Sequence, residues 1–426
     1  MLTFKTMGPV AAAKSKGFTL IELAVGLVVS ISVLGVVGAI FVPSVGTYRN
    51  NQAVSYIQEN SRYGINTLAM AIDQAGFIGC NSTEPEALVN VSQLESATQW
   101  VGNMDIPLRL FPSSADASSV IGATARASDS GVTIGDVITT LSTGSASAVL
   151  VEHNAAAETV TFRGNLVGVL DDQIIVLNDC INSAMFGVGT GTYNGATDNT
   201  TTFSYASADT DNCDGASSGR VLLGKQGGTT HPTCDDSTNY EEYVFRAGSN
   251  ISDLLARSYF IAPSSIDGAT RNSLWGLAIG SDGSYSAPVE LIVGVDNLRA
   301  RYGVQGSTGA VRYLTGLDFS GIGTLTTDDV DSDGTTETFA DVISVEISLM
   351  LNSVADVGAR GSSARQNIEF PDFNGTPVNC VNIPVGAAAQ SACPGYIYDD
   401  EAAGTTNGRR LRRVVSKVFN LRNVVL

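Results

Sequence analysis

Six cysteines are the residues of this chain that are best suited to covalent chemistry. An even number permits up to three disulfide bonds, which six cysteines can form in fifteen ways. Spacing along the chain favours the short-range pairs Cys380–Cys393 and Cys213–Cys234, which leaves Cys80–Cys180 as the third. A bond of this kind typically stabilises a fold by about 2–4 kcal/mol.

An acidic segment further along the chain has the residue types of a calcium site. Asp329, Asp331 and Asp333 stand at alternate positions before Gly334, as oxygen ligands do at the start of an EF-hand loop. The twelfth position is Ala340, so the bidentate glutamate of that loop is missing. The segment predicts either a bound Ca²⁺ or a solvated acidic turn. Apart from this possible ion, we expect no cofactor to be required.

Other patterns with catalytic or metal-binding residue types lack the context that they need. His231 and Cys234 have the spacing of two zinc ligands, but no second close pair completes a tetrahedral site. Ser217 lies in a Gly-x-Ser-x-Gly pattern, yet the flanking residues are polar and indicate neither the strand nor the helix of a hydrolase elbow. The only other histidine is His153. The sequence therefore predicts that the protein is not an enzyme.

Charge also argues against nucleic acid as a partner. The chain carries 42 Asp and Glu against 24 Lys and Arg, a net charge of −18, whereas affinity for nucleic acid comes mostly from cations that meet phosphates. A cationic cluster near the C-terminus is the exception, and we interpret it as a solvated strand face. Its members are Arg409, Arg410, Arg412, Arg413, Lys417 and Arg422.

The N-terminal region predicts a membrane-spanning helix. Residues 1–17 contain three lysines and no acid, and the next 25 residues, Phe18 to Val42, carry one charge. As a helix this run would be about 37 Å long, enough to cross a hydrocarbon core of about 30 Å. The basic flank precedes the run, so the N-terminus is expected in the cytoplasm and the rest across the membrane.

The single charge in this run is Glu22, whose carboxylate needs a partner. A carboxylate inside a bilayer costs about 2.5–3.5 kcal/mol or more, and such residues are usually functional. From the residue types we expect no partner within the helix itself. An amine at residue 18 of a neighbouring copy is one candidate partner, and snorkelling to the membrane interface is the alternative.

A second helical pattern follows Pro43, which is expected to end or kink the first helix. An apolar stripe at steps of three and four residues predicts an amphipathic helix that stops near Gly76 or Gly79. Together the two patterns predict one long helix over about 18–78. The stripe consists of Val54, Ile57, Ser61, Ile65, Leu68 and Ile72.

Residues 79–426 are expected to form a large, mainly antiparallel, loop-rich β head, which makes the fold class α+β. Short runs rich in Val, Ile, Thr, Phe and Tyr alternate there with Gly, Ser, Asp and Asn, as strands alternate with turns. The polar stretch 182–239 is expected to be a surface excursion. Strands are predicted over 131–139, 148–152, 159–163, 173–177, 240–246, 258–262, 274–278, 288–295, 298–303, 341–352 and 410–421.

The string Lys14-Ser-Lys-Gly17-Phe18-Thr-Leu-Ile-Glu22-Leu resembles the class III signal of type IV prepilins and of type II secretion pseudopilins. The resemblance implies that residues 1–17 are a leader peptide, that a prepilin peptidase cleaves after Gly17, and that Phe18 is N-methylated. It also implies polymerisation through the helix, with Glu22 neutralising the amine of an adjacent subunit.

The head resembles the PilW-type minor pilins. The motifs that carry this resemblance are Gln58-Glu-Asn-Ser-Arg-Tyr-Gly64, Asp73-Gln-Ala-Gly-Phe-Ile-Gly-Cys80, Leu177-Asn-Asp-Cys180, the region from Tyr259 to Trp275, Val293-Gly-Val-Asp-Asn-Leu-Arg-Ala-Arg-Tyr-Gly303, Val342 to Leu351, and Phe419-Asn-Leu-Arg-Asn423. One departure follows Tyr302-Gly-Val, where Gln305-Gly-Ser-Thr-Gly replaces the Asp/Gly-rich turn of the family.

The resemblance implies a structural pilin that helps prime or cap a type IV pilus. Its partners would be other minor and major pilins, the prepilin peptidase and the inner-membrane assembly platform. The chain would begin as a single-pass protein of the bacterial inner membrane and end in the extracellular pilus. Two alternatives stay open. One is a type II secretion minor pseudopilin, and the other is a tip adhesin tuned by calcium at Asp329–Asp333.

Overall fold

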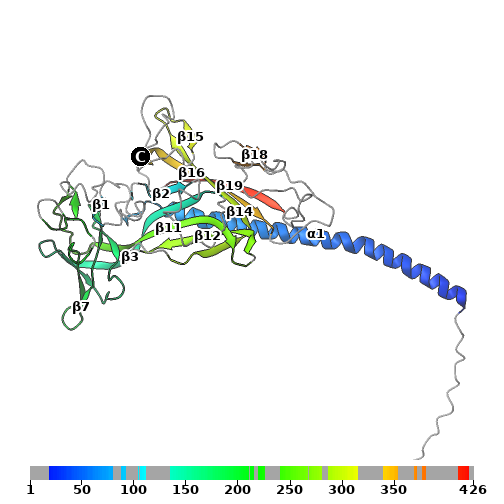
Figure 1. Ribbon diagram of the computed structural model, residues 1–426, viewed down its shortest axis with the longest axis horizontal. Helices are drawn as coiled ribbons and strands as arrows, with labels where there is room; N and C mark the ends of the chain where they lie inside the picture. Colours follow the sequence, from blue (N-terminus) through cyan, green and yellow to red (C-terminus); the bar gives the residue numbers. More distant parts are fainter. Residues whose placement is uncertain are drawn as a thin grey trace, which may run out of the picture. The chain divides into compact units, whose positions relative to one another are not determined.

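The computed structural model describes the long N-terminal helix and most of the β head (Figure 1). The described residues are 19–79, 88–92, 104, 106–111, 135–210, 212–214, 219–225, 240–266, 268–280, 286–314, 339–353, 369–371, 377–379 and 411–421. The chain divides after Gln52 into two compact units. The combination of one long helix and a mainly antiparallel head confirms the predicted α+β class.

Helix α1 runs from Leu20 to Gln74 without interruption. Of the two effects expected of Pro43, to end or to kink the helix, an end at Pro43 is therefore excluded, and the helix is one long element as predicted. A proline removes one backbone hydrogen bond, and the hydroxyls of Ser44 and Thr47 bond to the carbonyls of Ile40 and Pro43 at 2.7 and 3.0 Å. Neither bond replaces the one that proline removes, which would run from residue 43 to the carbonyl of residue 39.

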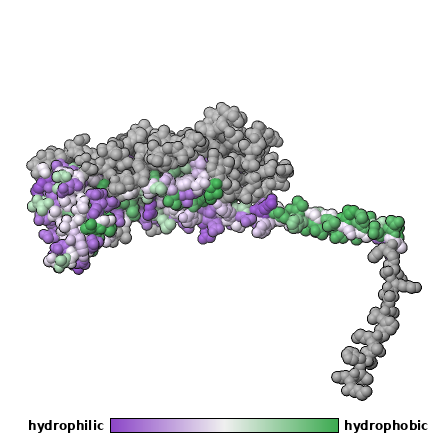
Figure 2. Space-filling model, turned by 60° about the horizontal axis from the view of Figure 1, so that its bottom comes forward, coloured by the Kyte–Doolittle hydropathy of each residue, from purple (hydrophilic) through white to green (hydrophobic). Residues whose placement is uncertain are grey.

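The N-terminal part of α1 exposes its apolar side chains all round. Every large apolar side chain from Leu20 to Val42 is at least 55% exposed, and Figure 2 shows this part of the helix as a hydrophobic surface. The helix is long enough and apolar enough to cross a membrane, with a mean hydropathy of 2.7 and none of the relevant window buried.

The C-terminal part of α1 buries one stripe against the head, as the periodicity predicts. Ile57, Ser61, Ile65, Leu68 and Ile72 are all buried. The predicted first member, Val54, is 38% exposed, and its neighbour Ala53 is buried instead. Gly64 also belongs to the stripe, because a Cβ there would lie 2.8 Å from Ile292 and 3.2 Å from Leu349.

The helix ends at two glycines, as predicted. Gly76 and Gly79 have φ angles of +76° and +88°, in the left-handed region that favours glycine. The amide of Gly76 donates to the carbonyl of Leu141 at 2.9 Å. These turns pass the chain from α1 into the β head.

An 11-stranded sheet forms the larger part of the head among the described residues, in the order β1-β6-β5-β11-β3-β4-β8-β7, with β12, β13 and β2 attached to β11, β12 and β3. β1 and β6 pair in parallel, and the other pairs are antiparallel. The strands are β1 (Leu88–Asn90), β2 (Leu108–Phe111), β3 (Val137–Asn154), β4 (Thr159–Arg163), β5 (Ile174–Asn178), β6 (Ser183–Gly187), β7 (Thr192–Asn194), β8 (Thr200–Ser204), β11 (Asn250–Ser264), β12 (Gly268–Ile279) and β13 (Val289–Val293).

A second, antiparallel sheet has the order β15-β14-β16-β19. Its strands are β14 (Val295–Gln305), β15 (Val311–Leu314), β16 (Val342–Asn352) and β19 (Arg412–Asn420), and a 3-10 turn, Phe339–Asp341, precedes β16. Two short pairs complete the described strands. They are β9 (Gly224–Lys225) with β10 (Tyr240–Glu241) and β17 (Glu369–Pro371) with β18 (Pro377–Asn379).

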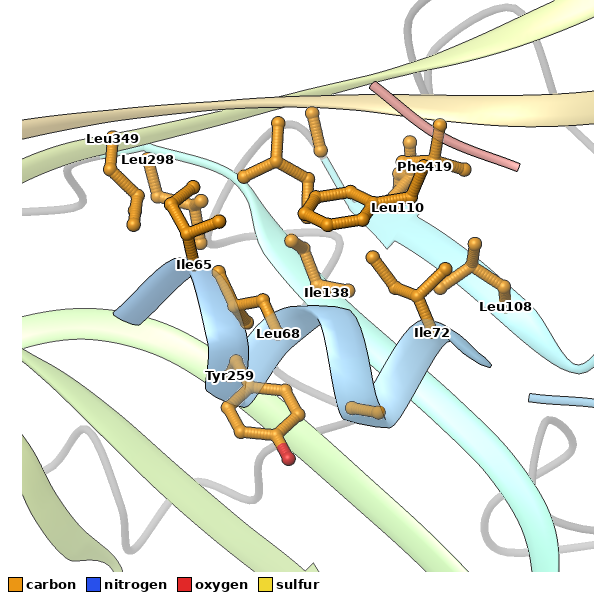
Figure 3. Close-up of a cluster of buried hydrophobic side chains, with 14 of the residues drawn as sticks. Ile65, Leu68, Ile72, Leu108, Leu110, Ile138, Tyr259, Leu298, Leu349 and Phe419 are labelled. Atoms are coloured by element: carbon orange, nitrogen blue, oxygen red, sulfur yellow. The ribbon is translucent and has the colours of Figure 1, made fainter. Parts of the chain in front are cut away.

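Three clusters of buried apolar side chains fill the described part of the head. Core 1 joins the stripe of α1 to the four-stranded sheet (Figure 3), where Ile65, Leu68 and Ile72 lie among Leu298, Leu349 and Phe419. Core 2 lies around Leu141, Leu254 and Phe260. Core 3 lies around Phe162, Phe186 and Phe203. The long strands β3 and β11 contribute side chains to all three cores.

Two expectations about the head differ from the structure. The described part of the stretch 182–239 is not only a surface excursion, because Phe186, Phe203 and Tyr205 are at most 1% exposed in core 3. The strand predicted over 240–246 stops at Glu241. Residues 242–246 lie outside any strand. Hydrogen bonds to the side chains of Asp179 and His153 hold them in place of strand pairing.

Candidate functional site

The first candidate site is the start of α1, where Glu22 lies. Glu22 Oε2 accepts two hydrogen bonds from Thr19, one from the backbone amide and one from the side-chain hydroxyl, both at 2.9 Å. In return, Thr19 Oγ1 accepts a bond from the amide of Glu22 at 3.3 Å. This reciprocal arrangement is a capping box, which satisfies amides that would otherwise lack partners at a helix start.

The expectation that the helix supplies no partner for Glu22 is wrong. Thr19 supplies one, and the corresponding Thr-x-x-Glu spacing lies within the first residues of the apolar run, whose composition hides it. Both bonds from Thr19 go to Oε2, and Oε1 takes part in neither. One carboxylate can thus cap its own helix while its other oxygen accepts a bond from a second group. Gly17 and Phe18 lie outside the described residues.

A second group of polar residues lies along β14, within the motif Val293–Gly303. Gly294 begins the motif with a φ of +84°, and a Cβ there would lie 3.0 Å from the carbonyl oxygen of Asn352. Asp296 Oδ2 accepts a bond from Arg412 Nε at 2.8 Å, and Asn352 donates to Oδ1 of the same carboxylate. Asp296 therefore joins β14 to the ends of β16 and β19.

Arg299 forms a deeply buried ion pair with Asp136. Its Nη1 lies 2.7 Å from Asp136 Oδ1, and the two side chains are 3% and 6% exposed. The amide of Ala300 donates to Asp136 Oδ2 at 2.8 Å. Burial raises the pKa of Asp136 to about 6, although the attraction of Arg299 and the hydrogen bond from Ala300 both lower it. Asp136 precedes β3, so this pair ties the two larger sheets together.

The end of the β14 motif makes further structural contacts. Arg301 pairs with Glu346 of β16. The buried hydroxyl of Tyr302 donates to the carbonyl of Leu108 at 3.0 Å and accepts from the amide of Leu110 at 2.8 Å. These polar residues thus tie β14 to β2 of the other sheet and to its neighbour β16. These contacts connect strands to one another and do not pair a nucleophile with a base. We therefore interpret the role of the motif as structural.

Two of the predicted disulfide candidates are described, and both Cys180 and Cys213 are disulfide-bonded. Asn178 Nδ2 donates to the carbonyl of Ile78 at 2.8 Å, and Asn178 Oδ1 accepts from the amide of Cys180 at 2.8 Å. The end of the helix and the turn at Cys180 are therefore neighbours. Cys80, Cys234, Cys380 and Cys393 lie outside the described residues, so the pairing stays a prediction.

His153 is a buried residue for which the sequence indicated no role. Its Nδ1 accepts a bond from the amide of Phe245 at 3.0 Å, and its Nε2 lies 2.8 Å from the hydroxyl of Tyr205. Burial lowers the pKa of His153 to about 4, although Glu242 acts in the opposite direction. The imidazole is therefore neutral at pH 7 and serves as a structural link.

Most of the other predicted sites fall outside the described residues. These are the calcium candidates Asp329, Asp331 and Asp333, the zinc candidates His231 and Cys234, and Ser217. Within the described ranges, His, Cys, Asp and Glu side chains form no group of three that would hold a metal ion.

The cationic C-terminal cluster is only partly a solvated face. Arg413 and Lys417 are exposed on β19. Arg412 is not, because its side chain is 6% exposed and pairs with Asp296. Arg409, Arg410 and Arg422 lie outside the described residues. One cation of the expected patch thus serves the fold rather than a partner.

Comparison with known proteins gives one family match. Residues 258–423 match the family model described as Type IV Pilus-assembly protein W (PilW), which confirms over that range the resemblance predicted from the sequence. A type IV-like pilin from Thermus thermophilus aligns with 41% of this chain and 70% of its own, at 15% identity and a TM-score of 0.19, too low to carry an argument. No curated protein matches the chain.

Proposed function

We propose that this chain is a minor pilin that helps to prime or cap a type IV pilus. The match of residues 258–423 to the pilus-assembly family is the observation that supports this proposal most. The matched range includes β12 to β19, and it contributes most of the head's side chains that pack with α1 in core 1. A match over these residues, together with the exposed apolar half of α1, fits a subunit that enters a filament through its helix.

The proposed mechanism begins in the membrane. A prepilin peptidase removes residues 1–17, and the new amine of Phe18 is methylated. The helix then leaves the bilayer and packs among other pilin helices, which bury the apolar surface that it exposes alone. Glu22 pairs with the amine of a neighbouring subunit, while Thr19 keeps the carboxylate bonded within its own chain. An ion pair in this apolar setting sets the register between subunits.

Size supports a low-copy position in the filament. The head follows the helix for more than three hundred residues, and a head of this size would crowd a filament in which every subunit carried one. A position at the tip, with other minor pilins, leaves room for it. We therefore place the protein in a priming or tip complex rather than along the shaft.

Processing and filament entry are tested together by mass. Sheared surface filaments are collected from wild-type cells and from the Gly17→Arg variant, and intact mass and N-terminal sequencing are measured on this protein. We expect a chain beginning at methylated Phe18 in the wild-type shear fraction and its absence from the variant fraction. Full-length protein confined to the membrane in both strains would contradict the proposal.

The two alternatives predict different phenotypes. Loss of a priming pilin removes surface pili, and loss of a tip adhesin leaves pili that do not attach. Loss of a type II secretion pseudopilin blocks protein export while surface pili remain. The shared N-terminal signal keeps the pseudopilin as the second candidate, so pilus counts and an export assay in one deletion strain distinguish the three.

A further inference from the structure

His153 connects three segments of the head that are distant in the sequence. It lies near the end of β3, Tyr205 follows β8, and Phe245 follows β10. The imidazole is 8% exposed, and its centroid lies 5.6 Å from the ring of Tyr205 and 5.9 Å from that of Phe245. Because Nδ1 accepts the amide proton of Phe245, the imidazole proton is on Nε2 and is donated to Tyr205.

Protonation of this imidazole would break the arrangement. A second proton on Nδ1 would turn the acceptor into a donor that faces the N–H of Phe245. The new charge would also be buried beside two aromatic rings, where desolvation disfavours it. His153 therefore holds the segment after β10 only in its neutral form.

Charged groups also contact this region, whereas residues 248 and 249 are held to β3 by backbone bonds, because the amide of Gly248 donates to the carbonyl of Leu150 and the amide of Leu150 to the carbonyl of Ser249, both at 2.8 Å. Arg220 pairs with Glu242 at 2.8 Å and also donates to the carbonyl of Ala155 at 2.9 Å. The amide of Val221 donates to Glu158 Oε1 at 2.6 Å. The bonds to Ala155 and Glu158 hold residues 220 and 221 to the β3–β4 region, and the Arg220–Glu242 pair joins the two segments to each other.

We propose that β9, β10 and their flanking residues, over 219–225 and 240–247, form an acid-releasable latch on the β3–β4 region, with His153 as its switch. At neutral pH the latch covers core 3, to which it contributes Val221, Leu223 and Phe245. In acid the latch detaches and exposes apolar side chains of core 3. The latch is independent of the proposed pilus role, since it rests only on contacts within the head.

The sign of the pH dependence follows from the charges that face His153. Glu242 favours the protonated imidazole, and burial disfavours it more strongly. On the side of the imidazole where Tyr205 lies, Glu158 and Arg220 interact with that tyrosine. On the opposite contact, Tyr243 packs on Phe245 and bonds to Asp179. Because the pKa is about 4 in the closed latch against 6.5 when exposed, the stabilising effect is full above pH 6.5 and is lost as the pH falls to 4.

Hydrogen exchange of the full chain in detergent micelles tests the latch. Rates are measured between pH 7 and pH 4 and corrected for the intrinsic pH dependence of exchange. We expect the opening of residues 219–225 and 240–247 to rise by about a hundredfold over this range. We expect no comparable rise in β14 and β16. A uniform rise across the head, or none in the latch, would overturn the proposal.

Two variants assign the effect to the imidazole. His153→Asn keeps an acceptor near the Nδ1 position but does not titrate, so the pH dependence of the opening should be lost. His231→Gln removes the only other histidine and should leave the opening unchanged. If the opening of His153→Asn matches the wild type, His153 is not the switch.

A direct titration covers the case in which His153→Asn fails to fold. The Cε1–H resonance of His153 is followed by NMR in the wild-type chain labelled at histidine, with His231→Gln for assignment. We expect a midpoint near pH 4 that coincides with the faster exchange of the latch. A midpoint near 6.5, without any change in exchange, would contradict the proposal.

Discussion

At the scale of single residues, Thr19 and Glu22 form a capping box, and the same carboxylate has the role in assembly that we propose. Glu22 satisfies the amide of Thr19, which would otherwise lack a partner at the helix start. The threonine in turn fixes the rotamer of the carboxylate through its hydroxyl. A carboxylate held in one rotamer loses less side-chain entropy when it binds a second group. We therefore assign Thr19 a positioning role in the proposed assembly.

We predict that Thr19→Val lowers incorporation of this protein into sheared filaments by several fold, because valine has the shape of threonine without its hydroxyl. Thr19→Ser should restore incorporation, since serine caps helices as well. Glu22→Gln should abolish it, because the amide carries no charge. Immunoblots of shear and membrane fractions measure the result. Equal incorporation of the valine and serine variants would show that the hydroxyl does not position Glu22.

The buried pair between Asp136 and Arg299 gives a prediction about stability. Arg299→Met leaves Asp136 without this cationic partner, and breaking a buried ion pair of this kind costs about 3–5 kcal/mol. The matched control is Arg220→Met, at a pair whose side chains are 33% and 50% exposed, where we expect about 1 kcal/mol or less. Urea unfolding of the detergent-solubilised chain gives both values. Similar losses in the two variants would contradict this ranking.

Part of this residue-level chemistry could be predicted from the sequence. Glu22 stands out because a lone charge in an apolar run is costly. Thr19 does not stand out, because its capping-box spacing lies inside a run whose apolar composition dominates the pattern. The pairs of Asp136 with Arg299 and of Asp296 with Arg412 lie 163 and 116 residues apart in the chain, and no local pattern identifies such partners. The distant partners of His153 escape prediction for the same reason.

At the scale of elements, α1 was predicted best because its pattern is long and periodic. Val54 shows the limit of that pattern. It is exposed while its neighbour Ala53 is buried, so the buried face at the start of the stripe is displaced by one residue from the predicted one. The strands β4 and β16 were also predicted closely, from runs of β-branched residues between turns. The segment 242–246 has a strand-like composition but pairs with no described strand, so tertiary contacts decide its conformation.

The end of α1 gives a prediction about covalent structure. Gly79 lies against Asn178, since a Cβ on this glycine would lie 3.4 Å from Asn178 Nδ2, and Cys180 is disulfide-bonded. Cys80 follows Gly79 directly, so we predict the bond Cys80–Cys180. Peptide mapping of the non-reduced protein should recover residues around 80 and 180 in one linked fragment. Linkage of Cys180 to Cys213, Cys234, Cys380 or Cys393 would refute this pairing.

At the scale of the whole molecule, the three cores divide the head into parts with different contacts. Core 1 contains apolar side chains of the C-terminal part of α1. Most of its other members come from the PilW-matched range. Core 3 contains no residue of α1 and none from that range, since its members lie between Val89 and Ile251. The matched range thus contributes most of the head's side chains in core 1 and none in core 3.

This division predicts that the cores open separately. Leu68 in core 1 and Phe203 in core 3 are both completely buried, and each alanine substitution should cost about 2–5 kcal/mol. Because the two side chains share no core, Leu68→Ala should raise hydrogen exchange in β14 and β16, and Phe203→Ala should raise it in β4 and β8. β3 and β11 run through both regions and would transmit part of each effect.

The same pair of variants connects stability to assembly. If the helix enters the filament only while core 1 holds it against the head, Leu68→Ala should reduce incorporation into sheared filaments more than Phe203→Ala, although both lose similar stability. The membrane fraction serves as the control for expression. Equal losses of incorporation would mean that the head assembles as one cooperative unit, in which core 3 supports the helix as much as core 1 does.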